Sequence, residues 1–188
     1  MTEERNYTNG WITTYSGVRF WPLDPNPADI HIEDIAHHLS QQCRWAGGTR
    51  VFYSTSQHSV LVSLCCDPDD ALDGLLHDAS EAYLSDIVRP LKHSPELAGY
   101  RAVEARMMAA VRQRFGLKAV QPDSVYWADD FVMRAERRDL IAPVSDFVLT
   151  GPTMAATIVP VSPLEAEAAF LSRFLLLTNK YPEDCNGD

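Results

Sequence analysis

Apolar residues recur at helical spacing along most of the chain. The spacing of Ile32, Ile35, Ala36 and Leu39 predicts a helix over about residues 31–43. The same periodicity, together with capping and helix-breaking residues at the segment ends, predicts five further helices, over residues 56–66, 69–84, 95–115, 123–140 and 163–178. The pattern therefore predicts an all-α protein.

Only the N-terminal part of the chain has the pattern of β-strands. Residues 11–15 and 18–21 contain mostly aromatic and β-branched side chains. Ser16 and Gly17 separate these two runs and suit a tight turn. We therefore expect a short β-hairpin within about residues 11–24.

The remaining segments complete a single domain over residues 1–188, with its helical core at about residues 30–141. A chain of this length is long enough to bury a core of its own. Residues 141–162 include several prolines and glycines and are expected to form a connector. The tail, residues 181–188, is expected to be disordered.

Composition and charge restrict the possible partners. The residues are 46% hydrophobic and 22% charged, as in ordinary globular proteins, and the formal net charge is −10. A net acidic chain is poorly suited to bind nucleic-acid polymers, whose phosphates require a basic surface. No apolar run approaches the roughly 18 residues of a membrane helix, and the acidic start does not resemble a signal peptide. A cytoplasmic protein without membrane or nucleic-acid partners is expected.

The number and spacing of the cysteines also agree with a cytoplasmic protein. None of the four has the CxxC spacing of a metal or redox motif, and they form no compact secreted framework: Cys43, Cys65, Cys66 and Cys185. Reduced thiols are therefore expected.

The dipeptide His77-Asp78 is the strongest chemical signal in the chain. It follows the apolar pair Leu75-Leu76, and placing an imidazole and a carboxylate near a core is costly. A divalent cation would offset this cost, because neutral histidine and ionised aspartate are good ligands for first-row metals. The pair therefore indicates a metal site and, with it, a hydrolase.

Further ligands must come from other helices. His58 lies on the preceding predicted helix, which a short connection makes a neighbour of the His77 segment. Asp129 lies on a later helix, and Asp130 beside it is a competing candidate. Taken singly, these residues are ordinary surface residues. Their order along the chain gives them their significance.

A histidine, then His-Asp, then a distal aspartate on successive helices resembles the HD-domain phosphohydrolases. The chain is most similar to their bacterial 5′-deoxynucleotidase (YfbR-like) branch and to the related phage dATP triphosphohydrolases. The resemblance extends from about Thr14 to Leu140 and rests on Tyr15-Ser16-Gly17 through Pro22-Leu23-Asp24-Pro25, Cys43-Arg44-Trp45, Tyr53-Ser54 through His58-Ser59, His77 through Lys92, Ala128-Asp129 and Glu136 through Leu140.

The resemblance implies an HD-domain helical bundle with a metal centre. Its implied ligands are His58, His77, Asp78 and Asp129. Asp129 is preferred to Asp130, because it lies seven residues before a glutamate, as in the similar proteins. Co, Mn, Zn, Ni and Fe all suit this ligand set, and a second ion such as Mg would be compatible with it. The cation would activate a water and stabilise charge on phosphorus.

Two acidic residues are expected to serve catalysis. Glu81 lies four residues after His77 and would share its helix face, where it could accept a proton from water or help to hold a second ion. By resemblance, Asp86 contacts the sugar or a metal-bound water. Its alternative role is that of a turn residue.

The resemblance also implies a nucleotide pocket. Arg44 and Trp45 match an Arg-Trp pair that lines it, with the guanidinium suited to phosphate and the indole to base or sugar. Lys92 matches a phosphate-contacting position, and Pro90 is expected in the pocket wall.

Departures from related families narrow the expectation. The HDxGK pattern of enzymes that act on cyclic dinucleotides is absent, and Ala82 after Glu81 breaks the Glu-Asp pair of stringent-response hydrolases. The glycine pair Gly47-Gly48 just after Trp45 leaves base specificity open. The remaining histidines, His37 and His38 included, are expected on solvated faces, whereas the Met107 and Trp127 regions are expected in the core.

The expected function is metal-dependent hydrolysis of a nucleotide phosphate, with a 5′-deoxynucleoside monophosphate as the favoured substrate. One alternative is a dATP-like triphosphohydrolase that releases triphosphate. Another is a non-catalytic, metal-containing nucleotide-binding protein. The resemblance also implies self-association into a dimer or a larger homo-oligomer.

Overall fold

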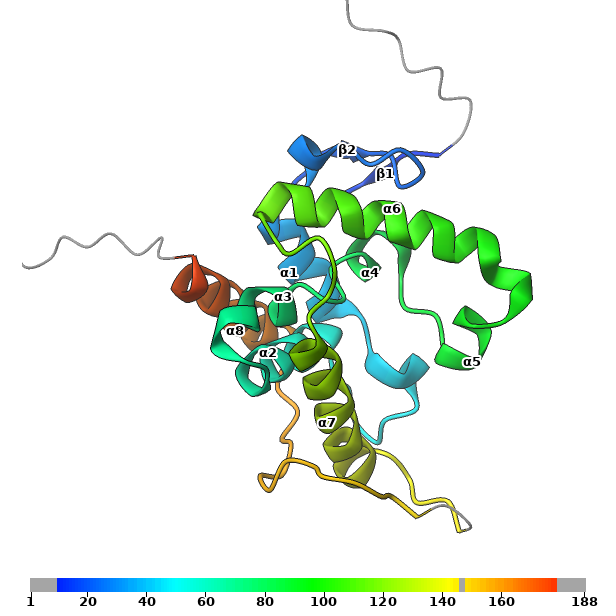
Figure 1. Ribbon diagram of the computed structural model, residues 1–188, viewed down its shortest axis with the longest axis vertical. Helices are drawn as coiled ribbons and strands as arrows, with labels where there is room; N and C mark the ends of the chain where they lie inside the picture. Colours follow the sequence, from blue (N-terminus) through cyan, green and yellow to red (C-terminus); the bar gives the residue numbers. More distant parts are fainter. Residues whose placement is uncertain (1–9, 146–147, 179–188) are drawn as a thin grey trace, which may run out of the picture.

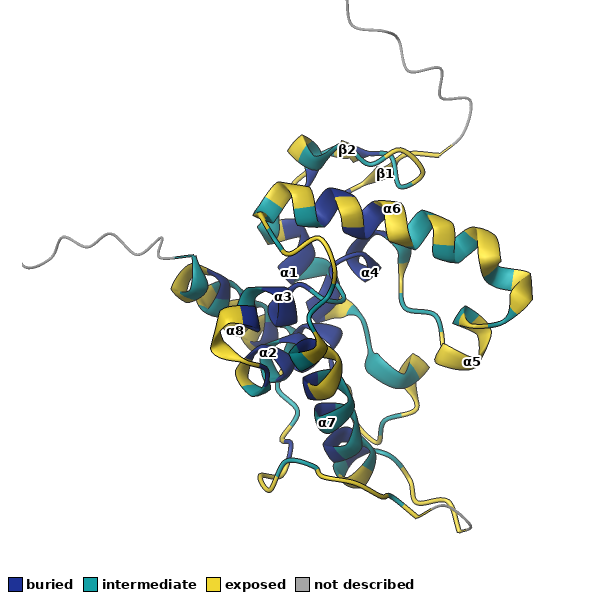
Figure 2. Cartoon of the chain, in the orientation of Figure 1, coloured by how far each residue is buried: buried dark blue, intermediate teal, exposed yellow. Residues whose placement is uncertain are grey.

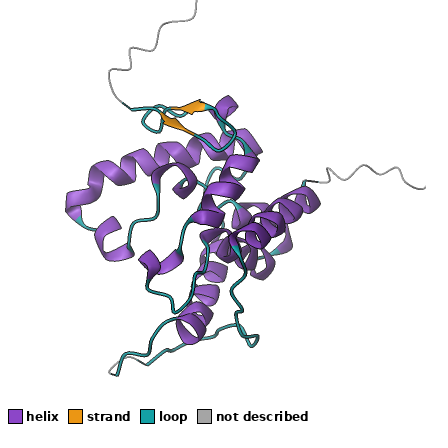
Figure 3. Ribbon diagram, turned by 180° about the vertical axis from the view of Figure 1, so that it is seen from behind, coloured by secondary structure: helices purple, strands orange, loops and turns teal. Residues whose placement is uncertain are grey.

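The computed structural model describes residues 10–145 and 148–178, most of which are helical (Figures 1 and 3). The helices are α1 (Ile32–Gln41), α2 (Thr55–Cys65), α3 (Ala71–Leu75), α4 (Glu81–Leu84), α5 (Arg89–Lys92), α6 (Ala98–Phe115), α7 (Asp123–Leu140) and α8 (Pro163–Leu177). Four short 3₁₀ turns lie at Pro27–Asp29, Arg44–Gly47, Pro68–Asp70 and Pro95–Leu97. The prediction of a mostly helical fold is confirmed.

The central helix of the fold is α2, which contacts α1, α3, α7 and α8. Six of its eleven residues are buried, and Figure 2 shows dark blue around the labels of α1, α2 and α3. The largest apolar cluster joins α1, α3, α6 and α8 to the N-terminal hairpin, and includes Phe20, Leu39, Leu75, Met107 and Phe170. The expectation that the Met107 region belongs to the core is therefore confirmed.

The expected hairpin is present. Strand β1 (Ile12–Thr13) pairs with β2 (Arg19–Phe20) in antiparallel register, with Ile12 opposite Phe20. Gly17 provides the turn with φ of +84°, a conformation that side chains disfavour. Phe20 is fully buried and stacks on Tyr83 at 4.2 Å between ring centroids. The hairpin is thereby fixed against the helix that follows the His-Asp pair.

Helix ends with strong capping signals lie at or near their predicted positions. The Ser54 side chain accepts the backbone N–H of Gln57 at the start of α2, and Ser162 forms a capping box with Glu165 at the start of α8. Gly116 ends α6 in the left-handed conformation, with φ of +68°.

The predicted continuous helix over residues 69–84 is wrong. After α3 the chain forms tight turns, with hydrogen bonds from Ala79 N–H to Leu76 O (3.1 Å) and from Glu81 N–H to Asp78 O (2.9 Å). The His77 ring bonds through Nδ1 to Gly74 O at 2.8 Å, so a side chain takes a carbonyl at the end of α3. His77 and Asp78 consequently project from a turn, and Glu81 at the start of α4 does not share a helix face with them.

Two neighbouring histidines of α1 are half-buried and form tertiary contacts, which the expectation of a simple solvated face did not include. His37 stacks on Tyr15 at 3.7 Å between centroids and bonds to Glu167 at 3.0 Å. The His38 ring contacts Ala82 O through Nδ1 at 2.6 Å. Both rings therefore take part in tertiary contacts that connect α1 with the hairpin, α8 and α4.

The Trp127 region also differs from the expectation. Trp127 is 51% exposed on α7 and stacks on Phe131 instead of entering the core. Residues 141–162 contain no helix among those described, as predicted for a connector. Cys43, Cys65 and Cys66 are free thiols. Cys185 and the tail 181–188 lie outside the described residues.

Membrane crossing requires a long, apolar helix, and no helix within residues 10–145 and 148–178 has both properties.

Gly74 permits α3 to approach α2 closely, and its replacement provides a test of this packing. A Cβ at Gly74 would lie 2.8 Å from Cys66 Sγ and 3.2 Å from Ser63 Cα. The thiol can rotate but the backbone cannot, so we expect Gly74→Ala to lower the free energy of unfolding by about 1–3 kcal/mol. Gly99→Ala is the control, because nothing lies within 4 Å there, and it should stabilise α6 by about 0.5–1 kcal/mol. Urea unfolding of both variants measures these changes. Equal unfolding midpoints for Gly74→Ala and Gly99→Ala would contradict the close approach of α3 to α2.

Candidate metal centre and adjoining pocket

Three side chains from separate elements converge on one point. His58 comes from α2, His77 from the turn after α3, and Asp129 from α7. The two Nε2 atoms lie 3.3 Å apart, and His58 Nε2 lies 3.2 Å from Asp129 Oδ1. Ligands at about 2.0–2.2 Å from a shared tetrahedral ion lie about 3.3–3.6 Å apart, so these donors fit a single divalent cation. The structure therefore contains a group that could hold a metal ion.

Asp78 borders the same group. Its Oδ2 lies 3.2 Å from His77 Nε2 and 3.8 Å from His58 Nε2. The same oxygen accepts a hydrogen bond from Arg44 Nη1 at 3.3 Å. Asp78 thus lies beside the group of His58, His77 and Asp129 and is shared between the two histidines and an arginine.

Asp130 faces another direction. It forms an ion pair with Arg134, one turn further along α7, and its side chain is 42% exposed. Of the two adjacent aspartates, the structure brings only Asp129 to the histidines.

Glu136 orients His58 from behind. The His58 Nδ1–H donates to Glu136 Oε1 at 2.6 Å, which turns Nε2 towards the other ligands. Trp45 Nε1 and Arg44 Nη2 donate to Glu136 Oε2 at 2.9 and 3.4 Å. From the sequence, Glu136 was noted for its spacing from Asp129, and its contact with His58 was not predicted. Its position two helical turns after Asp129 was the available signal.

The charges of the group strongly perturb its titration. Burial opposes protonation of His77, but the charge and hydrogen bond of Asp78 outweigh burial and raise the pKa of His77 to about 9. Burial likewise opposes ionisation of Glu136, whereas Arg44 and His58 hold its pKa well below the usual range. A cation bound by neutral His77 would take the place of this proton.

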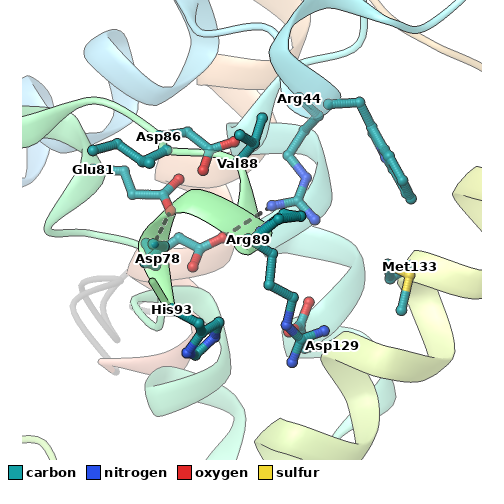
Figure 4. A pocket seen from close by; sticks show the side chains of 13 residues that line it. Arg44, Asp78, Glu81, Asp86, Val88, Arg89, His93, Asp129 and Met133 are labelled. Atoms are coloured by element: carbon teal, nitrogen blue, oxygen red, sulfur yellow. Dashed lines mark hydrogen bonds and ion pairs between the residues drawn. The ribbon is translucent and has the colours of Figure 1, made fainter. Parts of the chain in front are cut away.

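A pocket of about 410 Å³ adjoins the group (Figure 4). Its lining residues come from the 3₁₀ turn at Arg44–Gly47, from residues 78–93 and from α7: Arg44, Trp45, Asp78, Glu81, Asp86, Ile87, Val88, Arg89, Pro90, Lys92, His93, Asp129 and Met133. Every residue predicted to contact substrate or to serve catalysis lies here. Five further lining residues were not predicted as site residues: Ile87, Val88, Arg89, His93 and Met133.

Glu81 is nearly inaccessible to solvent at one side of this pocket. Its Oε1 lies 3.4 Å from Lys92 Nζ, and no hydrogen-bond partner of Oε2 occurs among the described residues. Burial raises the pKa of Glu81 well above its usual value, and repulsion from Asp78 and Asp86 adds to the effect. A carboxylate with a raised pKa and a free oxygen is a suitable proton acceptor.

Trp45 has an unusual backbone at the pocket wall. Trp45 and Ala46 have φ of +58° and +50°, in the left-handed region that costs side-chain-bearing residues about 1 kcal/mol or more each. The indole N–H bond to Glu136 helps to hold this conformation. Trp45 thus joins the pocket wall to the residues behind His58.

Comparisons with known proteins identify two relatives of this chain. No protein-family model matches the chain. Over 168 residues the chain is 39% identical to YfdR of Escherichia coli K12, an uncharacterized protein, and the match covers 87% of this chain and 93% of YfdR. An uncharacterized protein of Rhodobacter capsulatus is 43% identical over 121 residues, covering 60% of this chain and 61% of that protein. The chain therefore belongs to the family of YfdR.

Proposed function

We propose that this protein is a metal-dependent phosphohydrolase of the HD-domain type that acts on a 5′-deoxynucleoside monophosphate. The observation that supports the proposal best is the convergence of His58, His77 and Asp129 beside a pocket with both cationic and apolar walls. A hydrolase of this type needs its ligands, proton acceptor and phosphate-binding cations within reach of one bound molecule.

Different residues would bind the cation and accept the proton of the attacking water. His58, His77 and Asp129 would hold the cation, with Asp78 beside them as a fourth ligand. The bound cation would supply activation of water and stabilisation of charge on phosphorus. Glu81 accepts the proton of the attacking water at Oε2, the oxygen without a partner among the described residues.

The pocket has room for a nucleoside next to the phosphate. Trp45, Val88, Pro90 and Met133 offer apolar surface for base and sugar. Asp86 lines the same space and provides a carboxylate for a sugar hydroxyl. Trp45, Pro90 and Asp86 would therefore surround the nucleoside part of one bound ligand.

The positively charged side chains Arg44 and Lys92 favour a monophosphate substrate over a triphosphate. Arg44 contacts the carboxylates of Asp78 and Glu136, and Lys92 contacts those of Glu81 and Glu104. Much of the positive charge of both side chains is therefore compensated within the protein. A triphosphate carries about four negative charges at neutral pH and would need more uncompensated cations than a monophosphate.

Turnover assays test the proposal. The protein loaded with Mn, Co or Zn is offered a panel of deoxynucleoside monophosphates and triphosphates, and the products are identified. Phosphate release from a monophosphate is expected. Triphosphate release from a deoxynucleoside triphosphate would support the triphosphohydrolase alternative instead. Bound metal without any turnover would contradict an enzyme.

Glu81→Gln separates catalysis from cation binding. The amide keeps the shape of the side chain but cannot accept the proton, so we expect a rate about 10²–10⁴-fold lower with unchanged metal content. Metal content by mass spectrometry and initial rates provide the two measurements. A variant with the wild-type rate would remove Glu81 from the mechanism.

A further inference from the structure

We propose that Arg89 binds the phosphate of the substrate, a role that the sequence pattern suggested for Lys92 on the same segment but not for Arg89. The inference rests on the proposed function, because it concerns the ligand of the same pocket. Arg89 lines the pocket together with Asp78 and Asp129. Figure 4 shows its guanidinium directed into the space on the Asp129 side.

Arg89 has no acidic partner among the described residues, unlike Arg44 and Lys92, which also line the pocket. Arg44 and Lys92 each form ion pairs with two carboxylates. No ion pair or hydrogen bond of the Arg89 side chain occurs among the described residues. Its charge and its donors are therefore available to an anionic ligand.

The segment that carries Arg89 is fixed at both ends by α6. At the start, the Tyr100 hydroxyl donates to Ser85 O at 3.0 Å. At the end, Arg101 Nη1 donates to Lys92 O at 2.7 Å and to Ser94 O at 2.6 Å. These bonds anchor residues 85–94, which contribute Asp86 to Pro90, Lys92 and His93 to the pocket lining. Arg89 consequently extends from an anchored backbone towards the candidate metal group.

Position and chemistry together identify the ligand group. A guanidinium donates two parallel hydrogen bonds and matches two oxygens of a phosphate. A phosphate next to His58, His77 and Asp129 would direct its remaining oxygens into the pocket that Arg89 lines. Arg89 thus supplies the uncompensated charge that Arg44 and Lys92 lack.

Arg89→Ala tests the assignment, with Arg106→Ala as the matched control. Arg106 is an exposed arginine of α6 outside the pocket, and its loss changes the net charge equally. With metal-loaded protein and a deoxynucleoside monophosphate, we expect Arg89→Ala to raise both KM and the inhibition constant of inorganic phosphate about tenfold or more. The value of kcat should change less. Arg89→Lys should restore part of the loss, because it keeps the charge without the two-pronged geometry.

The outcomes distinguish this inference from the proposed function. If the wild type turns over a nucleotide while Arg89→Ala keeps its KM and its phosphate inhibition, only the Arg89 assignment is overturned. An equal loss in Arg106→Ala would also overturn it, since a general charge effect would then explain the result. If the wild type turns over nothing, calorimetric titration of the metal-loaded proteins with inorganic phosphate decides. Weaker binding to Arg89→Ala alone would then support the assignment, and equal binding would overturn it.

Discussion

We expect Asp129→Ala to lose the bound cation and catalytic turnover together, while Asp130→Ala keeps both near the wild-type level. The two residues are neighbours on α7 and have the same side chain, but only Asp129 reaches the histidines. Loss of a residue that merely supports a ligand lowers metal affinity 10–100-fold, so loss of a ligand should cost more than about 100-fold. Turnover should fall to background with it.

The pair of variants controls for folding as well as for charge. Each removes one carboxylate from the same turn of the same helix. Asp130→Ala loses an ion pair with Arg134 one turn away, which is worth only about 0.3–0.5 kcal/mol at an exposed site. Metal content after dialysis and rates at saturating cation provide the readout. Wild-type metal content in Asp129→Ala would show that the ligand group is misassigned. Loss of metal from both variants would show that the effect comes from disturbing α7 and not from removing a ligand.

The sequence predicted the fold well where the signal is local. Ser54 and Ser162 cap their helices through their own side chains, and Gly116 ends α6 through its own backbone freedom. Such signals require no knowledge of the tertiary structure. The break after α3 depends instead on the bond between His77 and Gly74 O, and apolar periodicity does not reveal a side chain that competes with the helix.

The candidate site likewise contains residues that the sequence predicted and residues that only the tertiary structure shows. The meeting of His58, His77 and Asp129 was predicted through the resemblance to HD-domain phosphohydrolases, which rests on the order of these residues along the chain. Glu136 has a periodic relation to Asp129 and could have been found from it. Arg89 has no such relation to any ligand, because the anchoring of its segment by α6 places it in the pocket. Pro90 and Lys92 of the same segment were predicted only through the resemblance, and Arg89, which matched no family motif, was missed.

Glu136→Ala should be among the most destabilising single changes in this protein. The carboxylate is fully buried and accepts bonds from His58, Trp45 and Arg44. Its removal leaves a buried guanidinium short of one partner and two ring N–H groups without acceptors. Breaking a buried charge pair in this way typically costs about 3–5 kcal/mol. Because His58 also loses its orientation, cation affinity should fall about 10–100-fold.

Glu136→Gln distinguishes charge from shape, and pH makes the distinction quantitative. The amide oxygen keeps one acceptor, so the variant should fold at neutral pH with a smaller loss of unfolding free energy. Arg44 and His58, opposed by burial, depress the pKa of Glu136 in the folded protein. The stability from this carboxylate is therefore complete above the ordinary glutamate pKa of about 4.5 and declines as the pH falls below it. Urea unfolding of the metal-free proteins should show the gap between wild type and Glu136→Gln narrowing between neutral pH and pH of about 3.5. A gap that stays constant would mean that Glu136 contributes its shape and not its charge.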